Sequence, residues 1–300
     1  MRVLVTGAGG FVGRHLVEHL RGRGDQVVTW SGGAGSPDIR QPDELRTALG
    51  GEPYEAIYHL AAQSRVDLSW SQPSDTLAVN AGGTANLMRA LDAVDSAARV
   101  LLMSSAEVYG AVDDAALPID EEQPLVPRSP YGVSKAAAEE LALLLGEASG
   151  RDVVICRPFN QIGPGQADTF VTAALARQVV ALERTGGGTI AVGNLTATRD
   201  FLDVRDAVEA YRCLMESGAA GETYNVCSSQ ETVVRSILDG LVASASVEAN
   251  VEIDPQRFRP NDLPRMAGSS SKLRSATGWA PHRALSDTLA DVLEDWRRAE

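Results

Sequence analysis

The segment that most constrains the fold of this chain is a glycine-rich turn at its beginning. The apolar run Arg2–Thr6 predicts a buried strand, and Gly7-Ala8-Gly9-Gly10-Phe11-Val12-Gly13 follows it directly. In this G-x-x-G-x-x-G spacing, Gly7 permits a tight turn, Gly10 lets backbone N–H groups approach a pyrophosphate, and Gly13 lets the next helix pack closely on the sheet. Because the turn joins a predicted strand to a predicted helix, it indicates a dinucleotide-binding unit rather than an ordinary loop.

Strand and helix patterns alternate through the first half of the chain. Strand-like runs occur at Arg2–Thr6, Gln26–Trp30, Ala56–Leu60, Val100–Ser104 and Val153–Pro158, with helical patterns at Phe11–Arg21, Val79–Ala93 and Tyr131–Glu147. We therefore expect an α/β fold with a Rossmann-like, doubly wound parallel sheet. After Pro158, a helix near Phe170–Arg184 and short elements predict a smaller α/β substrate lobe, with loops at Gly186–Gly188, Gly193–Arg199 and Arg257–Pro264. The predicted dinucleotide-binding domain covers residues 1–158, completed by about 199–228, and the substrate-binding lobe covers residues 159–198 and 229–300.

Charge and hydropathy exclude several classes of partner. The net charge of −13 repels nucleic acid and anionic lipid, so neither is an expected partner. There is no run of 18 apolar residues and no secretory signal at the N-terminus, so we expect a cytoplasmic protein without a membrane span. Cys156, Cys213 and Cys227 are far apart in apolar surroundings, which favours buried thiols over a disulfide, and we expect no metal site.

The residues after the second predicted strand bear on the choice between NADP and NAD. An acidic residue at this point would hold the ribose 2′-hydroxyl of NAD, but the chain has Trp30-Ser31-Gly32-Gly33. No carboxylate repels a 2′-phosphate there, and Ser31 can bond one. The sequence thus favours NADP(H) and leaves NAD(H) open. Asp38 fits either an adenine contact or a turn residue.

Tyr131 and Lys135 are predicted to stand side by side on one helix face, because they are four residues apart near its start. A nearby cation lowers the pKa of a phenol and brings it closer to the range in which it exchanges protons at neutral pH. Ser105 follows the strand Val100–Ser104, at the sheet edge where open α/β folds bind ligands. We therefore predict Ser105, Tyr131 and Lys135 as catalytic residues.

Several motifs together resemble the extended short-chain dehydrogenase/reductase family. Besides the glycine-rich turn they are His59-Leu60-Ala61-Ala62, Asn80-Ala81-Gly82-Gly83-Thr84, Ser129-Pro130-Tyr131-Gly132-Val133-Ser134-Lys135, Arg199-Asp200-Phe201-Leu202-Asp203-Val204 and Gly278-Trp279-Ala280-Pro281. The resemblance implies that Tyr131 is the proton donor or acceptor, that Lys135 assists it, and that Ser105 is the third member. Asn80 would brace the active-site helix. The implied cofactor site comprises Gly7, Gly10, Phe11, Val12, Gly13, Ser31, Asp38, Ile39, Leu60, Ala61, Ala62, Asn80, Tyr131 and Lys135.

Within that family the chain is most similar to the GDP-4-keto-6-deoxy-mannose reductases, which form GDP-rhamnose, and to their relatives the GDP-mannose 4,6-dehydratases. This likeness rests on Phe159-Asn160-Gln161-Ile162-Gly163-Pro164-Gly165-Gln166, Phe170-Val171, Val192-Gly193-Asn194-Leu195, Tyr224-Asn225-Val226-Cys227-Ser228, Arg259-Pro260 and Leu263-Pro264. It implies that Asn160, Arg199 and Arg259 hold a sugar and its diphosphate, a task suited to bidentate arginines. A surface ion pair is the alternative for each arginine. The implied substrate site comprises Ser64, Ser105, Ala106, Glu107, Asn160, Val171, Arg199 and Arg259.

The favoured activity is the NAD(P)H-dependent reduction of the C4 keto group of a nucleotide 4-keto-6-deoxyhexose, with a GDP-hexose as the expected partner. The alternative is a nucleotide-sugar 4,6-dehydratase or 4-epimerase that holds its NAD(P) tightly. Hexose dehydratases of the dTDP-glucose kind carry Thr-Asp-Glu where this chain has Ser105-Ala106-Glu107, and Ala106 cannot protonate a leaving hydroxyl. Glu107 remains as a candidate base, so the dehydratase stays open. A cofactor-sensing regulator is disfavoured by the Tyr131–Lys135 pair.

We also expect a homodimer joined by the helices Val79–Ala93 and Tyr131–Glu147. Both helices carry enough small and apolar residues to be buried on two faces. These residues are Ala81, Ala85, Leu87 and Ala90 on the first helix and Ala136, Ala137, Leu141 and Leu145 on the second.

Overall fold

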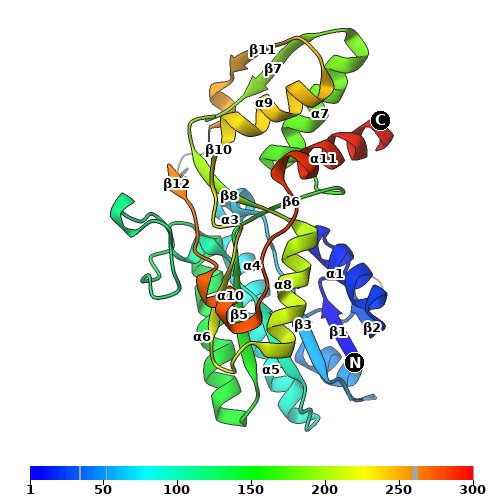
Figure 1. The fold of residues 1–300 in the computed structure, drawn as a ribbon. Coiled ribbons are helices and arrows are strands. Elements are labelled where there is room, and N and C mark those ends of the chain that lie inside the picture. The colour runs from blue at the N-terminus through cyan, green and yellow to red at the C-terminus, as the bar shows by residue number, and fades with distance from the viewer. Residues whose placement is uncertain (34, 52, 259–262, 300) are drawn as a thin grey trace.

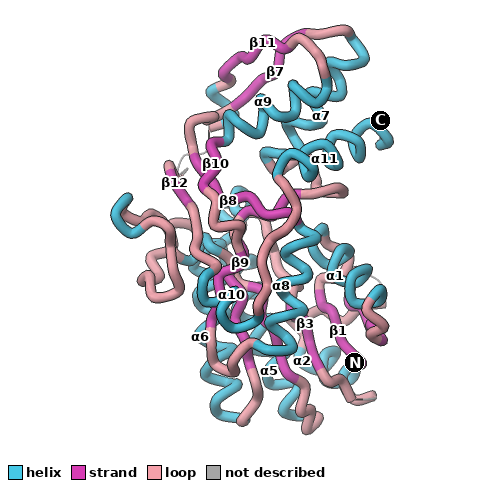
Figure 2. Tube along the Cα trace, viewed as in Figure 1, coloured by secondary structure: helices cyan, strands magenta, loops and turns pink. Residues whose placement is uncertain are grey.

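The computed structural model describes residues 1–33, 35–51, 53–258 and 263–299. Its larger part is built on a six-stranded sheet with the order β2-β1-β3-β4-β5-β9, in which every neighbouring pair is parallel. The strands are β1 (Arg2–Thr6), β2 (Gln26–Trp30), β3 (Ala56–His59), β4 (Arg99–Met103), β5 (Val153–Pro158) and β9 (Thr223–Val226). Figure 2 shows these strands running side by side through the lower half of the molecule.

Helices cover both faces of this sheet, because successive side chains along each strand point to opposite faces. Val3 and Val5 join one core with α1 (Phe11–Gly22) and α8 (Val204–Ser217). Leu4, between them, joins a second core with α2 (Pro42–Leu49), α5 (Gly83–Ala93) and α6 (Pro130–Ser149). The prediction of a Rossmann-like, doubly wound sheet is confirmed.

A smaller lobe lies above the large sheet in Figure 1. Its core is enclosed by α7 (Val171–Thr185), α9 (Val234–Ala245) and α11 (Leu285–Ala299). One small sheet holds β10 (Glu231–Val233), β8 (Thr198–Asp203) and β12 (Arg265–Met266), with β6 (Asn160–Ile162) paired to β8. A second contains β7 (Gly188–Val192) and β11 (Ala249–Ile253). Three short helices, α3 (Val66–Ser71), α4 (Pro73–Leu77) and α10 (Ser271–Thr277), are also present.

The chain crosses between the lobes more than once. β8 belongs to a small sheet, whereas α8 directly continues it and packs against α1 on the large sheet. The two lobes also meet at the loop after β6. Arg14 and His15 of α1 donate hydrogen bonds to the carbonyl oxygens of Gly165 and Pro164, each at 2.9 Å, and the Gly165 N–H donates to Asp295 of α11 at 2.7 Å. The expected domain boundaries stay a prediction.

Two expected elements differ from the structure. The helix expected over Val79–Ala93 begins as a π-helical turn at Ala78–Gly82, and only then continues as α5. The loop expected over Gly193–Arg199 ends earlier, because Thr198 and Arg199 pair with β10 and β12 as the start of β8. No helix in the described part of the chain is long and apolar enough to cross a bilayer.

Candidate active site

The glycine-rich turn has the close backbone approach that the sequence predicts. Gly7 has a φ of +71°, and a Cβ placed on it would lie 2.7 Å from the backbone nitrogen of Ala61. A Cβ on Gly13 would collide with the Gly7 carbonyl oxygen. Gly10 caps α1 without any side-chain hydrogen bond, so side chains do not compete for the first N–H groups of the helix. The turn therefore fits an anionic diphosphate at the positive end of α1.

A surface hollow of about 530 Å³ lies beside this turn, at the end of β2. Its lining includes Ser31 and Arg14. Asp38 is turned to Arg40, with 2.6 Å between carboxylate and guanidinium, and this contact lowers the pKa of Asp38. Ile39 is buried against α5, where a Cβ on Gly83 would lie 2.6 Å from its terminal carbon. Ser31 thus lines a hollow beside the glycine-rich turn, and the Asp38 carboxylate is paired with Arg40.

Helix α6 brings Tyr131 and Lys135 to the end of β4. Its first turn is fixed by Ser129, whose hydroxyl accepts a hydrogen bond from the Gly132 N–H at 3.0 Å. The Lys135 ammonium donates to the Met103 carbonyl at 2.7 Å, and Ser105 hydrogen-bonds with the Tyr131 phenol. The three predicted catalytic residues therefore gather at one point of the molecule.

Burial governs the ionisation of this group. It raises the pKa of Tyr131 well above its usual range; the Ser105 hydrogen bond opposes this rise, and the nearby Glu107 carboxylate adds to it. The expectation of a lowered phenol pKa is therefore wrong in this structure, where Lys135 is directed at the Met103 carbonyl. Burial also lowers the pKa of Lys135 to about 8, against the opposing charge of Glu139.

Asn80 links the π-helical turn to α6. Its amide nitrogen donates to the Ser134 hydroxyl at 2.9 Å and to the Gln63 carbonyl at 3.1 Å, while its amide oxygen accepts from the Gln63 N–H. Ser134 in turn donates to the Tyr131 carbonyl at 2.7 Å. These contacts fix the backbone that carries Tyr131. Leu60, Ala61 and Ala62 follow β3 at the same edge of the sheet and are half-buried.

His59 is a residue of this region that the sequence reasoning did not assign. Its ring is fully buried between the hydroxyls of Thr6 at 2.8 Å and Thr84 at 3.2 Å. Burial, reinforced by the charge of Lys135, lowers its pKa to about 3. The sequence did show a histidine inside an apolar strand, which could have drawn attention to this residue. In the structure its neutral ring links β1, β3 and α5 through hydrogen bonds to two hydroxyls.

Ala106 and Glu107 form a tight turn after Ser105. The Ser105 hydroxyl accepts the Glu107 N–H at 3.2 Å, and Ala106 is buried. Gly132 packs against this turn, since a Cβ on it would lie 2.7 Å from the Glu107 carbonyl oxygen. The Glu107 carboxylate lies near enough to Tyr131 to raise the pKa of its phenol. Ser64 is exposed on the segment before α3.

The remaining predicted substrate residues lie in the smaller lobe. Asn160 is on β6, and Arg199 is on the adjacent strand β8. The Arg199 guanidinium donates to the carbonyl oxygens of Thr198 at 2.7 Å and Leu263 at 2.8 Å. Val171 is partly exposed at the start of α7. Arg259 lies outside the described residues.

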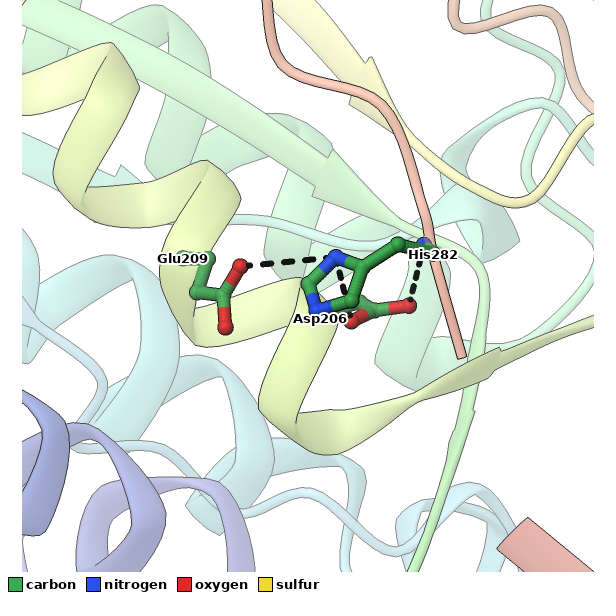
Figure 3. Close-up of side chains that lie close together, drawn as sticks. All are labelled: Asp206, Glu209 and His282. Atoms are coloured by element: carbon green, nitrogen blue, oxygen red, sulfur yellow. Dashed lines mark hydrogen bonds and ion pairs between the residues drawn. The ribbon is translucent and has the colours of Figure 1, made fainter. Parts of the chain in front are cut away.

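Asp206, Glu209 and His282 are the one group of potential metal ligands within the described ranges (Figure 3). Arg283 occupies this cluster, because its guanidinium pairs with both carboxylates. The backbone N–H groups of His282 and Arg283 also donate to Asp206, each at 3.0 Å. The cluster is therefore an ion-paired anchor that fastens the segment before α11 to α8.

The comparison with known proteins agrees with this geometry. The profile of a family described as GDP-mannose 4,6 dehydratase matches residues 4–292. The chain belongs to this family. As members of it are extended short-chain dehydrogenases/reductases, the family expected from the sequence is confirmed.

Relatives in the family cover the whole chain. The chain is 42% identical to a GDP-6-deoxy-D-mannose reductase of Pseudomonas aeruginosa, over 98% of the chain and 97% of the relative. The structure of RMD from Pseudomonas aeruginosa with NADPH superposes with a TM-score of 0.93, at 39% identity and full coverage of both chains. The UDP-glucose 4-epimerase of Thermus thermophilus with NAD superposes with a TM-score of 0.88, at 29% identity and full coverage of both chains.

Proposed function

We propose that this protein is an NADPH-dependent reductase that converts GDP-4-keto-6-deoxy-D-mannose to GDP-D-rhamnose. The observation that carries the proposal is the 42% identity, over nearly the full length of both chains, with a GDP-6-deoxy-D-mannose reductase. The gathering of Ser105, Tyr131 and Lys135 at the end of β4 supplies the groups that such a reaction needs.

The cofactor fits the residues present. The bound dinucleotide supplies the hydride. Gly7, Gly10 and Gly13 shape the turn for its diphosphate. Ser31, beside the hollow at the end of β2, stands where the 2′-phosphate of NADPH would need a hydrogen-bond donor. The choice of NADPH over NADH is further supported by the P. aeruginosa structure, which contains NADPH.

Tyr131 and Ser105 act on the carbonyl oxygen of the substrate. Their hydroxyls lie together, so both can donate to one oxygen and stabilise the negative charge that develops as the carbonyl is reduced. Tyr131 then transfers its proton to that oxygen. Because burial raises the pKa of Tyr131, the phenol is protonated at neutral pH, as an acid catalyst must be.

Lys135 assists from the next turn of α6. An ammonium group has three donors, and the Met103 carbonyl uses one of them. The other two remain for a ribose hydroxyl of the cofactor and for the phenolate that Tyr131 becomes after giving up its proton. Lys135 must be charged for both tasks.

Arg199 and Arg259 are proposed to hold the diphosphate of the nucleotide sugar. In a chain of net charge −13, an anionic ligand needs local positive charge. Arg199 lies on β8 in the lobe predicted to bind substrate, two residues before Phe201, which pairs with Asn160 on the neighbouring strand β6. Its bond to the Leu263 carbonyl also ties it to the chain that follows Arg259.

A dehydratase is the second candidate, and Glu107 is the observation that favours it. Its carboxylate is close enough to Tyr131 to raise the pKa of the phenol, which supports a position near a sugar carbonyl bound to Tyr131. A base in that position suits the removal of a proton beside a carbonyl. Ala106 argues against this activity, since a methyl group cannot protonate the departing hydroxyl. Stoichiometric consumption of NADPH distinguishes the two, because a dehydratase regenerates its cofactor.

We also infer a homodimer formed through α6. Val133 and Leu144 are 45% and 60% exposed, and Ala137 and Leu141 lie between them on the same face. Three of the four residues expected to take part on the other helix are buried within the chain itself: Ala81, Leu87 and Ala90. The α6 face is therefore the main support for this proposal.

A further inference from the structure

A chain of buried polar groups lies directly beneath the proposed active site. Glu139 of α6 and Arg157 of β5 are 1% and 7% exposed. Arg157 binds the Glu139 carboxylate with two nitrogens, at 3.0 Å and 2.7 Å. Its third nitrogen donates to the Tyr109 phenol at 3.0 Å, and Tyr109 donates to the Asn225 amide oxygen at 2.7 Å. Because desolvating two charges is costly, a buried ion pair of this kind is weak evidence for added stability.

Glu139 belongs to a regular set of contacts between α6 and the end of β4. Three consecutive residues each reach a different turn of α6. The Met103 carbonyl binds Lys135, the Ser104 hydroxyl donates to Glu139, and Ser105 hydrogen-bonds with Tyr131. Positions 131, 135 and 139 lie on one helix face, because they are four residues apart. Glu139 therefore fixes the register between the strand that carries Ser105 and the helix that carries Tyr131 and Lys135.

The same carboxylate sets the charge around Lys135. Glu139 is the counter-charge that acts on the buried ammonium, and it raises the pKa of Lys135 while burial lowers it. Ser104 from β4 and Arg157 from β5 also contact Glu139, and the buried Cys156 thiol lies within reach of its charge. From β3, the buried His59 lies within reach of the Lys135 ammonium charge. Without Glu139, two buried cations would share the site with no anion between them.

We propose that Glu139, held in place by Arg157, is a positioning residue that orients Lys135 and keeps it protonated for cofactor binding and proton transfer. This inference rests on the proposed reductase function for its catalytic readout, but its cofactor-binding readout is independent of the sugar. Glu139 itself touches neither substrate nor cofactor in this scheme. Arg157 acts one step further away, by holding the carboxylate.

The test compares Glu139→Gln with the matched control Glu140→Gln, which removes an exposed carboxylate one residue further along the same helix. The first measurement is the dissociation constant of NADPH as a function of pH. In wild type and in the control, affinity should fall as the pH rises past the Lys135 pKa of about 8. In Glu139→Gln this fall should begin roughly one pH unit lower, since one unit is an ordinary effect of losing a close counter-charge.

A double variant, Glu139→Gln with Arg157→Gln, removes one buried charge of each sign. It should return the alkaline fall in NADPH affinity toward the wild-type pH, because the net charge near Lys135 is restored. The conservative Glu139→Asp should keep the wild-type pH dependence. If the single variant does not fold, Arg157→Gln decides instead. It leaves Lys135 as the buried counter-charge of Glu139, so the fall in NADPH affinity should move to higher pH, and an unchanged pH dependence would overturn the proposal.

The second measurement is kcat for NADPH oxidation with GDP-4-keto-6-deoxy-D-mannose as a function of pH. In Glu139→Gln the fall of kcat on the alkaline side should begin at a lower pH than in wild type, by the same amount as the fall of NADPH affinity. The proposal is overturned if folded Glu139→Gln binds NADPH with the wild-type pH dependence, or if the double variant shifts as far as the single one. Failure of wild type to oxidise NADPH with the sugar would instead refute the proposed function, and the cofactor-binding comparison would still decide the role of Glu139.

Discussion

Substitution of Tyr131 should lower turnover while leaving folding and cofactor binding nearly unchanged. We predict that Tyr131→Phe folds, binds NADPH with nearly unchanged affinity, and loses turnover by roughly 10²–10⁴-fold, the usual contribution of a general acid. The substitution removes only the hydroxyl from a buried ring that Ser105 contacts. The measurements are kcat and the dissociation constant of NADPH. A kcat close to wild type would exclude Tyr131 as the proton donor.

Glu107 should be dispensable for reduction. Hydride addition to a carbonyl needs one proton donor, and Tyr131 provides it. Glu107→Gln keeps the shape of the side chain, and the turn stays fixed because the backbone N–H of residue 107 still reaches Ser105. We predict that kcat for NADPH oxidation stays within about tenfold of wild type, or about 1.4 kcal/mol of barrier. A loss of several orders of magnitude would place Glu107 in the catalytic step.

Arg199 should act on the nucleotide sugar and leave the cofactor alone. We predict that Arg199→Ala weakens substrate binding by about 2–5 kcal/mol, as expected when a charge pair loses one partner, with a much smaller effect on NADPH. Arg235→Ala is the control, because this arginine is exposed in the same lobe and pairs with Asp239. Titration calorimetry with GDP-D-rhamnose and with NADPH separates the two affinities. An equal loss of both would remove Arg199 from the substrate site.

Elements whose pattern is local were predictable from the sequence. The bounds of β1, β2 and β5 agree with the expected runs, because an apolar run is visible in consecutive residues. Helix α6 begins one residue before Tyr131, where Ser129-Pro130 marks a helix start. The π-helical turn around Asn80 was missed, because it accompanies contacts of Asn80 with Gln63 and Ser134 that no window of sequence contains.

The predicted catalytic residues meet, but the groups that support them were not foreseen. Glu139 stands four residues after Lys135, so its helix face was readable from the sequence. Its partners Ser104 and Arg157 come from β4 and β5, and only the sheet order brings them to the same helix. In the same way, the sequence showed His59 within a strand without showing that Thr6 and Thr84 enclose it.

The His59 link between β1, β3 and α5 makes stability depend on pH. A histidine in the unfolded chain binds a proton near pH 6.5, whereas His59 in the folded chain does so only near pH 3. Its contribution is therefore complete above pH 6.5 and is lost as the pH falls below that value. The loss should reach about 2 kcal/mol of the free energy of unfolding at pH 5.

Urea denaturation of wild type and His59→Gln between pH 7 and pH 5 measures this effect. The variant should be less stable at pH 7, because the hydroxyl contacts change, and its stability should fall less steeply toward pH 5. Parallel pH dependences in the two proteins would show that His59 is protonated in the folded chain or accessible to solvent.

At the scale of the whole molecule, the apolar face of α6 predicts the oligomeric state. Leu144→Glu places a charge on a residue that is 60% exposed at this face and should convert the dimer to a monomer in light scattering. Ile253→Glu is the control, because Ile253 is 65% exposed on β11 at the far end of the smaller lobe (Figure 1). A wild-type monomer at micromolar concentration would contradict the proposed dimer. The cytoplasmic location stays a prediction.

The two lobes divide the work of the proposed reaction. We propose that the large sheet and α1 hold the cofactor, that β6, β8 and their neighbours face the nucleotide sugar, and that Ser105, Tyr131 and Lys135 act at the end of β4 and the start of α6. Arg14 and His15 connect α1 to the loop after β6, so the two binding regions are in direct contact. The proposed reductase and the alternative dehydratase differ in whether this arrangement reduces a sugar or dehydrates one.

The most direct measurement gives wild type and Glu107→Gln both GDP-mannose and GDP-4-keto-6-deoxy-D-mannose, and follows NADPH and sugar products together. We predict that both proteins oxidise one NADPH per molecule of the 4-keto sugar, form GDP-D-rhamnose, and leave GDP-mannose unchanged. The reductase activity is contradicted if wild type converts GDP-mannose to the 4-keto sugar without net consumption of cofactor and Glu107→Gln abolishes that conversion.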